Sequence, residues 1–361
     1  MSAREAFWSG RSVFVTGHTG FKGGWLTLWL RRLGSTVHGY ALDPPTAPSF
    51  FELAGVERAL ASDFRADVRD LPLLRQAIAS ARPATVFHLA AQPLVRESYR
   101  DPVATFGVNT LGTVHVLEAI RHEESVREVV VVTTDKVYEN TETPAAHRES
   151  DRLGGRDPYS ASKAAAELAT ASFRSSYFGR SGRHRARIAT ARAGNVVGGG
   201  DWGLERLVPD CMRAFAAGRS VQLRHPDAVR PWQHVLEPLA GYLALAESLA
   251  GTGGEALARA WNFGPDPSAD ATVRRVAADL GRLWGPGGAI EYGEADAASP
   301  ETAHLSLDST DARRALGWSP RWTLPETLAR TVAWYRAWHN GDEMNAFSAG
   351  QIRDYESGGH E

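Results

Sequence analysis

The chain has 361 residues, 43% of them hydrophobic and 23% charged, with a net charge of −2, a composition ordinary for a globular protein. The small net charge gives no support to nucleic-acid binding, no apolar run reaches the roughly 18 residues of a membrane span, and the first residues lack the apolar core of a signal peptide. The single cysteine, Cys211, excludes an internal disulfide, and the histidines are scattered, so we expect a cytoplasmic enzyme without a metal site.

The first half of the chain alternates short β-branched runs with helical segments. In chain order the patterns predict a strand over 12–16, a helix over 21–33, strands over 36–42 and 64–68, a helix over 71–81, a strand over 85–89, a helix over 103–122, a strand over 129–132, a helix over 158–178 and a strand over 186–191. Apolar strands that alternate with helices indicate a parallel sheet covered on both faces. Right-handed crossovers then give a Rossmann-like, doubly wound α/β fold.

The second half of the chain has a different sequence pattern. After about residue 195 the predicted strands become fewer, and Gly and Pro interrupt short helices. We predict a dinucleotide-binding domain over residues 1–195 and a smaller α/β substrate lobe over 196–361, packed on the carboxyl edge of the sheet. The boundary is soft, because such lobes often return a strand to the main sheet.

A glycine-rich loop joins the first strand to the first helix. Its spacing, G-x-x-G-x-x-G, differs from the standard G-x-G-x-x-G. At a strand-to-helix turn, however, glycines let backbone N–H groups approach a pyrophosphate at the helix N-terminus, where the dipole favours anions. The position therefore predicts dinucleotide binding, and we assign cofactor contacts in this loop to Gly17, Thr19, Gly20, Phe21, Lys22 and Gly23.

Acidic residues end the next two strands. Asp43 can accept hydrogen bonds from the adenosine ribose and would repel a 2′-phosphate, which favours NAD over NADP; alternatively, it is a turn residue before two prolines. Asp67, with Val68, could meet the adenine, but Asp67 could equally cap a helix. Small residues after the fourth strand suit close passage of the cofactor, and contacts are assigned there to Leu89, Ala90 and Ala91.

Tyr159 and Lys163 share one helix face, because residues four apart are neighbours on a helix. Tyrosine at its reference pKa of about 10 is a poor base near neutrality. An ammonium beside the phenol favours the phenolate and lowers the tyrosine pKa, and a nicotinamide cation would add to this effect. Such pairs are common on surface helices, but downstream of a dinucleotide loop we interpret this one as catalytic and as contacting the cofactor.

Together these residues, with Thr134 and the segment 192–197, resemble the extended short-chain dehydrogenases/reductases that act on sugar nucleotides, over nearly the whole chain. Within that superfamily Thr134-Asp135-Lys136 resembles the Thr-Asp-Glu/Lys motif of nucleotide-sugar 4,6-dehydratases. Most of these carry Glu at the third position. Lys136, with the segments 17–25 and 224–235, resembles the branch that acts on CDP-glucose.

The resemblance implies NAD as the cofactor, a CDP-hexose as the substrate, and a homodimer or a dimer of dimers formed through the helices over 103–122 and 161–178. It assigns substrate contacts, among which Arg230 is the favoured diphosphate ligand, although it could also be a surface arginine. Weaker candidates are Asp201, Trp202, Glu301 and His304. The assigned substrate residues are Gln92, Asn195, Arg206, Leu207, Arg230 and Asn262.

The resemblance also implies a lyase reaction in three stages. Tyr159 takes the 4-hydroxyl proton while NAD accepts the C4 hydride, and Thr134 hydrogen-bonds the same oxygen. Water is then eliminated across C5–C6, with Asp135 as the acid and Lys136 as the base. Finally the hydride returns to C6, which leaves a 4-keto-6-deoxy sugar.

The protonation states of the acid and the base stay open at this point. Burial would raise the pKa of Asp135 and lower that of Lys136, toward the forms required. Alternatively, Asp135 stays ionised and orients the hydroxyl, while protonated Lys136 supplies the proton. We expect the two side chains to diverge, as neighbours on an extended chain do.

Other functions share parts of this pattern. A dehydratase for another nucleotide-linked hexose would differ only in the base. A UDP-sugar 4-epimerase would need no acid and base at 135 and 136 and would leave the 6-hydroxyl intact. A non-catalytic, NAD-dependent regulatory protein would keep the fold, but the presence of Thr134, Tyr159 and Lys163 argues against it.

Overall fold

A computed structural model of the chain describes residues 2–139, 145–179, 183–223, 225–266, 270–292 and 305–358. Its centre is a seven-stranded sheet in which all neighbouring strands are parallel. In spatial order the strands are β11 (Ala260–Asn262), β6 (Arg187–Arg192), β5 (Glu128–Val132), β4 (Thr85–His88), β1 (Ser12–Thr16), β2 (Thr36–Ala41) and β3 (Leu60–Arg65). The predicted Rossmann-like, doubly wound fold is confirmed.

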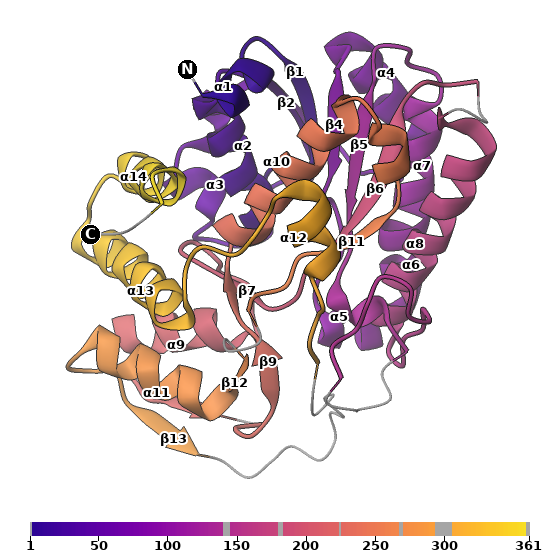
Figure 1. The fold of residues 1–361 in the computed structure, drawn as a ribbon. Helices are drawn as coiled ribbons and strands as arrows, with labels where there is room; N and C mark the ends of the chain where they lie inside the picture. The colour runs from indigo at the N-terminus through magenta and orange to yellow at the C-terminus, as the bar shows by residue number, and fades with distance from the viewer. Residues whose placement is uncertain are drawn as a thin grey trace.

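Helices cover both faces of the sheet (Figure 1). Successive side chains of a strand point to opposite faces, so the valine run of β5 supplies both layers: Val130 packs into one buried cluster, and Val129 and Val131 pack into the other. This explains why the strand has no polar alternation. The first layer contains α2 (Phe21–Arg32) and α10 (Leu236–Ala250), and the second contains α4 (Leu71–Ala81), α7 (Gly112–Ile120) and α8 (Pro158–Tyr177).

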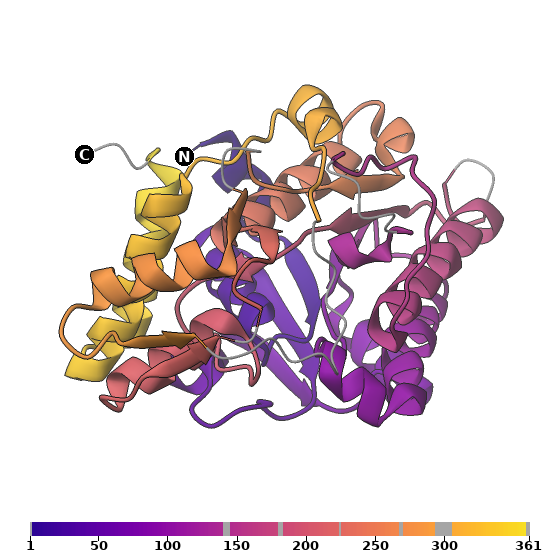
Figure 2. The ribbon, with the colours of Figure 1, turned by 90° about the horizontal axis from the view of Figure 1, so that it is seen from below.

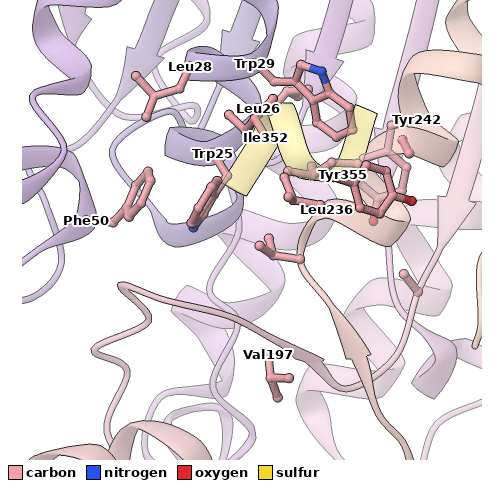
Figure 3. Close-up of a cluster of buried hydrophobic side chains, with 14 of the residues drawn as sticks. Trp25, Leu26, Leu28, Trp29, Phe50, Val197, Leu236, Tyr242, Ile352 and Tyr355 are labelled. Atoms are coloured by element: carbon pink, nitrogen blue, oxygen red, sulfur yellow. The ribbon is translucent and has the colours of Figure 1, made fainter. Parts of the chain in front are cut away.

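The C-terminal helix packs against α2, the helix that follows the glycine loop. Trp29 of α2 lies with its ring centroid 5.5 Å from that of Tyr355 in α14 (Met344–Glu356), and its indole N–H donates to Glu356 at 2.8 Å. Figure 3 shows these two rings in one cluster with Leu236 of α10. The end of the chain therefore holds the first βα unit against the C-terminal lobe.

The C-terminal lobe lies on one side of the sheet and the α7–α8 layer on the other (Figures 1 and 2). A strand from the second half, β11, belongs to the main sheet, and the boundary near residue 195 stays a prediction. The lobe contains α9 (Leu207–Ala216), α11 (Val273–Trp284), α12 (Thr310–Leu316), α13 (Leu324–Asn340) and three small strand pairs, which are β7 (Val196–Val197) with β10 (Gln233–His234), β8 (Val221–Leu223) with β13 (Ile290–Tyr292), and β9 (Val229–Pro231) with β12 (Asp270–Thr272).

Some element bounds differ from the prediction. The strand expected over 64–68 is β3, which spans Leu60–Arg65, because this edge strand is only partly buried and lacks the apolar run that marks the inner strands. The helix expected over 103–122 consists of α6 (Pro102–Phe106), the π-helical η2 (Gly107–Leu111) and α7. By length and composition alone Pro102–Ile120 could cross a membrane, but here it packs on α4 and α8. The remaining short helices are α1 (Ala3–Trp8), α3 (Phe50–Leu53), η1 (Val56–Ala59), α5 (Val95–Arg100), η3 (Asp135–Val137) and η5 (Gly254–Leu257).

Candidate active site

A cavity of about 840 Å³ runs along the carboxyl edge of the sheet and reaches into the C-terminal lobe. Residues that directly follow six strands of the sheet line it: Gly17 after β1, Leu42 after β2, Ala66 after β3, Leu89 after β4, Thr133 after β5 and Ala193 after β6. Ligands of doubly wound sheets bind at this edge, where the strand order reverses, here between β1 and β4. The cavity is at the large end of the range for ligand sites, roughly 300–1,000 Å³.

The glycine loop forms one wall of the cavity and fits a diphosphate. Gly17 has a φ of 80°, and a Cβ there would lie 2.7 Å from the backbone nitrogen of Ala90. A Cβ on Gly23 would overlap the carbonyl oxygen of Gly17. The N-cap of α2 is Gly20, which places no side chain over the first N–H groups. The close packing of these glycines leaves an uncapped helix N-terminus at the cavity wall, as an anion site requires.

The two predicted strand-end acids both line the cavity. The Asp43 side chain is 89% exposed and lies 3.3 Å from the guanidinium of Arg65, a neighbour that we did not predict. Asp67 pairs with Arg69 at 2.6 Å, and that hydrogen bond lowers the pKa of the Asp67 carboxyl. The alternative role of Asp67 as a helix cap is not observed, because Asp70 accepts the capping hydrogen bond of α4.

Thr134, Asp135 and Lys136 all line the cavity, directly after the buried end of β5. The strand ends at Val132, and Asp135–Val137 forms a 3₁₀ turn, so the expectation of an extended chain at this acid and base was wrong. The cause is local: the Thr134 hydroxyl caps the turn by accepting from Lys136 N at 3.4 Å. The same hydroxyl donates to Asp135 Oδ1 at 2.9 Å.

Asp135 is 1% exposed, and its second carboxylate oxygen, Oδ2, has no hydrogen-bond partner in the described part of the chain. This oxygen lies against Gly194, where any side chain would overlap it. A buried carboxylate oxygen without a partner is costly unless a ligand completes its bonding. Gly194 is a site residue that was not assigned from the sequence, although it lies in the segment 192–197 and follows β6 by two residues.

Tyr159 and Lys163 project from the start of α8, which Asp157 caps through a 2.9 Å bond from Ser160 N. Burial raises the pKa of Tyr159 to about 12, while a hydrogen bond with Thr134 acts in the opposite direction. Burial also lowers the pKa of Lys163 to about 8, and its ammonium donates to the carbonyl of Val132 at 3.1 Å. The predicted lowering of the tyrosine pKa is therefore outweighed by burial in this geometry.

Behind Lys163 lies a buried ion pair that sequence reasoning also missed. Glu167 and Arg192 are each 4% exposed in their side chains and meet at 2.9 Å. Thr133 and Thr190 donate to the two oxygens of the Glu167 carboxylate at 2.6 and 2.7 Å. These four side chains join the ends of β5 and β6 to α8. They therefore hold in place the strand end and the helix from which the predicted catalytic residues project.

The C-terminal lobe contributes positive charge to the cavity. Arg206, the N-cap of α9, pairs with the buried Asp201 at 2.9 Å, and that contact raises the pKa of the guanidinium. Arg230 is 6% exposed and lies on β9. Asn195, which has a φ of 24°, also lines the cavity. The other predicted residues of this lobe in the cavity wall are Leu207 and Trp202.

Two predicted substrate residues lie outside the cavity wall. The Gln92 amide donates to Leu94 O and Thr105 Oγ1 at 3.0 and 2.9 Å, which ties down the loop after β4. Asn262 is fully buried and accepts from Tyr138 OH at 2.6 Å, so its amide oxygen is already engaged. The weaker candidates Glu301 and His304 lie outside the described residues.

The chain has only three lysines among 40 Lys and Arg residues, and all three line this cavity: Lys22, Lys136 and Lys163. Arginine, which makes up the other 37, does not give up its proton in proteins. The lysine side chains of the protein are thus concentrated at one place. Within the described ranges, no group of three or more His, Cys, Asp or Glu side chains is arranged to hold a metal.

Known proteins share this architecture. The family model described as GDP-mannose 4,6 dehydratase matches residues 14–331. The chain is 46% identical to a CDP-glucose 4,6-dehydratase of Salmonella typhimurium, with 97% of this chain and 98% of that protein covered. Two solved structures are 25% identical and cover 90% of this chain: MoeE5 in complex with UDP-glucuronic acid and NAD (TM-score 0.73, 99% of that chain), and UDP-glucose 4-epimerase of Thermus thermophilus with NAD (TM-score 0.75, 98% of that chain).

The match extends over most of the sheet and the C-terminal lobe, and it includes the cavity between β1 and β4 with its glycine loop, its Thr-Asp-Lys turn and its Tyr-Lys pair. The chain therefore belongs to the GDP-mannose 4,6 dehydratase family.

Proposed function

We propose that the chain is an NAD-dependent CDP-glucose 4,6-dehydratase, a hydro-lyase that converts CDP-D-glucose to CDP-4-keto-6-deoxyglucose and water. The observation that carries the proposal is that Asp135 and Lys136 line the same cavity as Tyr159 and Lys163. An epimerase has no use for an additional acid and base, whereas an elimination requires both. The 46% identity with a CDP-glucose 4,6-dehydratase supports the choice of nucleotide.

The residues around the glycine loop fit NAD. The uncapped start of α2 would hold the pyrophosphate, Asp43 the adenosine ribose, and Tyr159 with Lys163 the nicotinamide end. When bound, NAD supplies the acceptor for the C4 hydride and returns that hydride to C6. The same cofactor in the solved structures of MoeE5 and the Thermus thermophilus epimerase supports this assignment.

The residues of the chain move the protons. Tyr159, as a phenolate, takes the proton of the 4-hydroxyl. Because burial raises the pKa of Tyr159 to about 12, the phenolate depends on nearby positive charge, here from Arg206. Lys136, as a neutral amine, takes the C5 proton, which the new 4-ketone has made acidic. Asp135 gives a proton to the 6-hydroxyl so that it can leave as water.

The substrate diphosphate would lie between the two lobes. Arg206 and Arg230 offer guanidinium groups that match phosphate geometry, and α9 begins at Leu207 with no side-chain cap on its first N–H groups. Arg230 has low exposure and Arg206 is tied to Asp201, so both are preorganised rather than free to adopt other rotamers.

We also propose that the protein acts in the cytoplasm as a homodimer or a dimer of dimers. Large apolar side chains are exposed on adjacent helices: Val103 and Phe106 of α6, Leu111 of η2, and Leu168 of α8, with exposures of 82, 39, 48 and 61%. Exposed apolar groups that gather on one face favour a protein partner. The apolar character of both helices supports a second copy of this chain as that partner.

A single assay tests the function. The protein is incubated with NAD and with CDP-, dTDP-, UDP- and GDP-glucose or -mannose, and the products are treated with alkali, which gives 4-keto sugars an ultraviolet absorbance. We expect a 4-keto-6-deoxy product from CDP-glucose and little from the others. A product that keeps its 6-hydroxyl would instead identify an epimerase, and absence of any product would contradict the enzyme assignment.

A further inference from the structure

Four side chains link the glycine loop to the end of β2, where the adenosine ribose of NAD is expected. His18 Nε2 in the loop lies 2.9 Å from Asp63 Oδ1 on β3. Arg65 donates from Nε and Nη2 to the two oxygens of Asp63, each at 2.8 Å, and from Nη1 to Asp43 Oδ1 at 3.3 Å. The guanidinium therefore lies between two carboxylates, of which Asp43 lines the cavity and Asp63 lies outside the cavity wall.

The pairing of β2 with β3 places Arg65 at this point. Arg65 is the last residue of β3 and lies opposite Ala41, the last residue of β2, which precedes Asp43 by two positions. Because Asp63 and Arg65 are two residues apart on a strand, their side chains project to the same face. There the guanidinium lies 4.6 Å from the centroid of the Phe51 ring. The two-pronged bond and the aromatic ring together hold the guanidinium in one orientation.

The linked side chains carry a net negative charge. Burial lowers the pKa of His18, so its ring is uncharged at neutral pH, and two carboxylates face one guanidinium. The 2′-hydroxyl of NAD suits this arrangement, since Asp43 can accept its hydrogen bond. A 2′-phosphate, as in NADP, would instead meet an excess of negative charge.

An arginine at this place would by itself favour NADP, because arginine accommodates the 2′-phosphate in proteins of this fold. Its guanidinium presents N–H donors in a planar fork that matches phosphate oxygens. Arg65 Nη1 donates to Asp43 Oδ1, so a phosphate oxygen at the position of Oδ1 would accept the same hydrogen bond. In the structure, however, the two carboxylates occupy the donors that a phosphate would need.

We propose, building on the NAD site of the proposed function, that Arg65 is a 2′-phosphate ligand kept out of use by Asp43 and Asp63. The two carboxylates then select NAD against NADP in different ways. Asp43 repels the phosphate directly and binds Arg65 Nη1, whereas Asp63 acts only through Arg65. Asp63 is accordingly a positioning residue of the cofactor site.

Direct binding of NAD and NADP tests the proposal in the absence of any sugar nucleotide. Isothermal titration calorimetry gives the ratio of the NADP to the NAD dissociation constant for the unmodified chain, Asp43→Ser, Arg65→Gln and the double variant. Serine removes the carboxylate but keeps a hydroxyl for the ribose. The control is Arg75→Gln, which removes the same charge from a surface pair with Glu118 that joins α4 to α7.

We expect a ratio well above one for the unmodified chain, and a ratio at or below one would overturn the selectivity. Asp43→Ser should lower the ratio about 100-fold, because a charged hydrogen bond from Arg65 to the phosphate replaces repulsion. The double variant should lose at least about tenfold of that gain, because the gain requires the guanidinium. Arg75→Gln should leave the ratio unchanged. Equal ratios in Asp43→Ser and the double variant would overturn the role of Arg65.

Asp63→Asn tests the positioning role. Asparagine can still hydrogen-bond but no longer offsets the charge of Arg65, so the ratio should fall about threefold or more. The same substitution in Arg65→Gln should leave the ratio unchanged. A purely structural role would weaken both nucleotides alike, so an unchanged ratio in Asp63→Asn would overturn its part in selectivity.

These outcomes are separate from those of the dehydratase assay. Ratios that do not respond to the substitutions overturn the selectivity proposal and leave the assignment as a dehydratase intact. An unmodified chain that binds NAD but forms no 4-keto sugar would overturn the proposed function alone. A chain that binds neither nucleotide would overturn both.

Discussion

The second carboxylate oxygen of Asp135 occupies the space in which a side chain on Gly194 would begin. We therefore predict that Gly194→Ala displaces the Asp135 carboxyl and lowers the dehydration rate about 100-fold or more, as for loss of a general acid. Gly350→Ala is the control, because its added methyl group would only come within 3.7 Å of Arg353, away from the cavity. Steady-state product formation and circular dichroism of both variants test this, and full activity in Gly194→Ala would contradict the placement of Asp135.

Lys136 is expected to act as a base, so charge alone should not replace it. Lys136→Arg keeps a cation but cannot release its proton near neutral pH. We predict that this variant still oxidises C4 but no longer exchanges the C5 hydrogen, with product formation reduced about 100-fold or more. The measurement is deuterium incorporation at C5 in D₂O by mass spectrometry. Normal incorporation in Lys136→Arg would assign the base to another group.

Lys163 should make stability depend on pH. Burial lowers its pKa from 10.5 in the unfolded chain to about 8 in the folded one. Between these values the unfolded chain binds more protons, so the free energy of unfolding rises with pH in this window and the penalty for a charged Lys163 is complete below about pH 8. Lys163→Met lacks this penalty, so its stability advantage over the unmodified chain should shrink by about 2–3 kcal/mol from pH 8 to 10.5.

Urea unfolding at several pH values measures that difference. The other groups titrate in both proteins, so their contributions cancel in the comparison. A constant difference between Lys163→Met and the unmodified chain across the window would mean that Lys163 keeps an ordinary pKa in the folded protein.

The buried pair behind the site should matter for stability more than the surface pairs do. Glu167→Gln leaves Arg192 charged and without its partner in a buried position, which should cost about 3–5 kcal/mol. Glu97→Gln removes a solvent-exposed pair with Arg100 and should cost less than about 1 kcal/mol. Denaturant midpoints of both variants give the comparison, and similar losses would show that the Glu167 environment is more hydrated than its 4% exposure indicates.

The proposed subunit interface can be tested with charge. Val103→Glu combined with Leu168→Glu places two carboxylates on the exposed apolar face of α6 and α8, and we expect the oligomer to dissociate to monomers. Leu73→Glu, at a 46% exposed position on α4, should leave the oligomer unchanged. Sedimentation velocity distinguishes the species; a double variant that sediments like the unmodified chain would exclude this face.

The sheet was predictable because its inner strands carry strong and unambiguous patterns. The five consecutively buried residues of β5 and the glycine loop after β1 each have one physical explanation, a strand covered on both faces and an anion-binding turn. Edge strand β3 was misplaced because only one side of it pairs and its side chains are half-buried. The more completely a strand is buried, the more clearly its sequence pattern predicts it.

The site was predictable where residues adjacent in sequence act together and less so where the fold brings distant residues together. Thr134 and Asp135 stand in one short motif, but the contact of Asp135 with Gly194 joins the ends of two strands and leaves no local trace. Asn262 shows the converse: a residue assigned to the substrate by its motif is bonded to Tyr138 inside the protein. Whether a polar side chain already has its hydrogen-bond partners inside the protein depends on the packed structure and cannot be read from the sequence.

The restriction of lysine to the cavity makes the site separately observable. Apart from the α-amino group, Lys22, Lys136 and Lys163 carry all the primary amines of the chain. Reductive ¹³C-methylation or ε-¹⁵N labelling would consequently produce a magnetic resonance spectrum whose few lysine signals all report from within the cavity. Titration of those signals, with and without nucleotide, would follow the protonation of each amine with no background from the molecular surface.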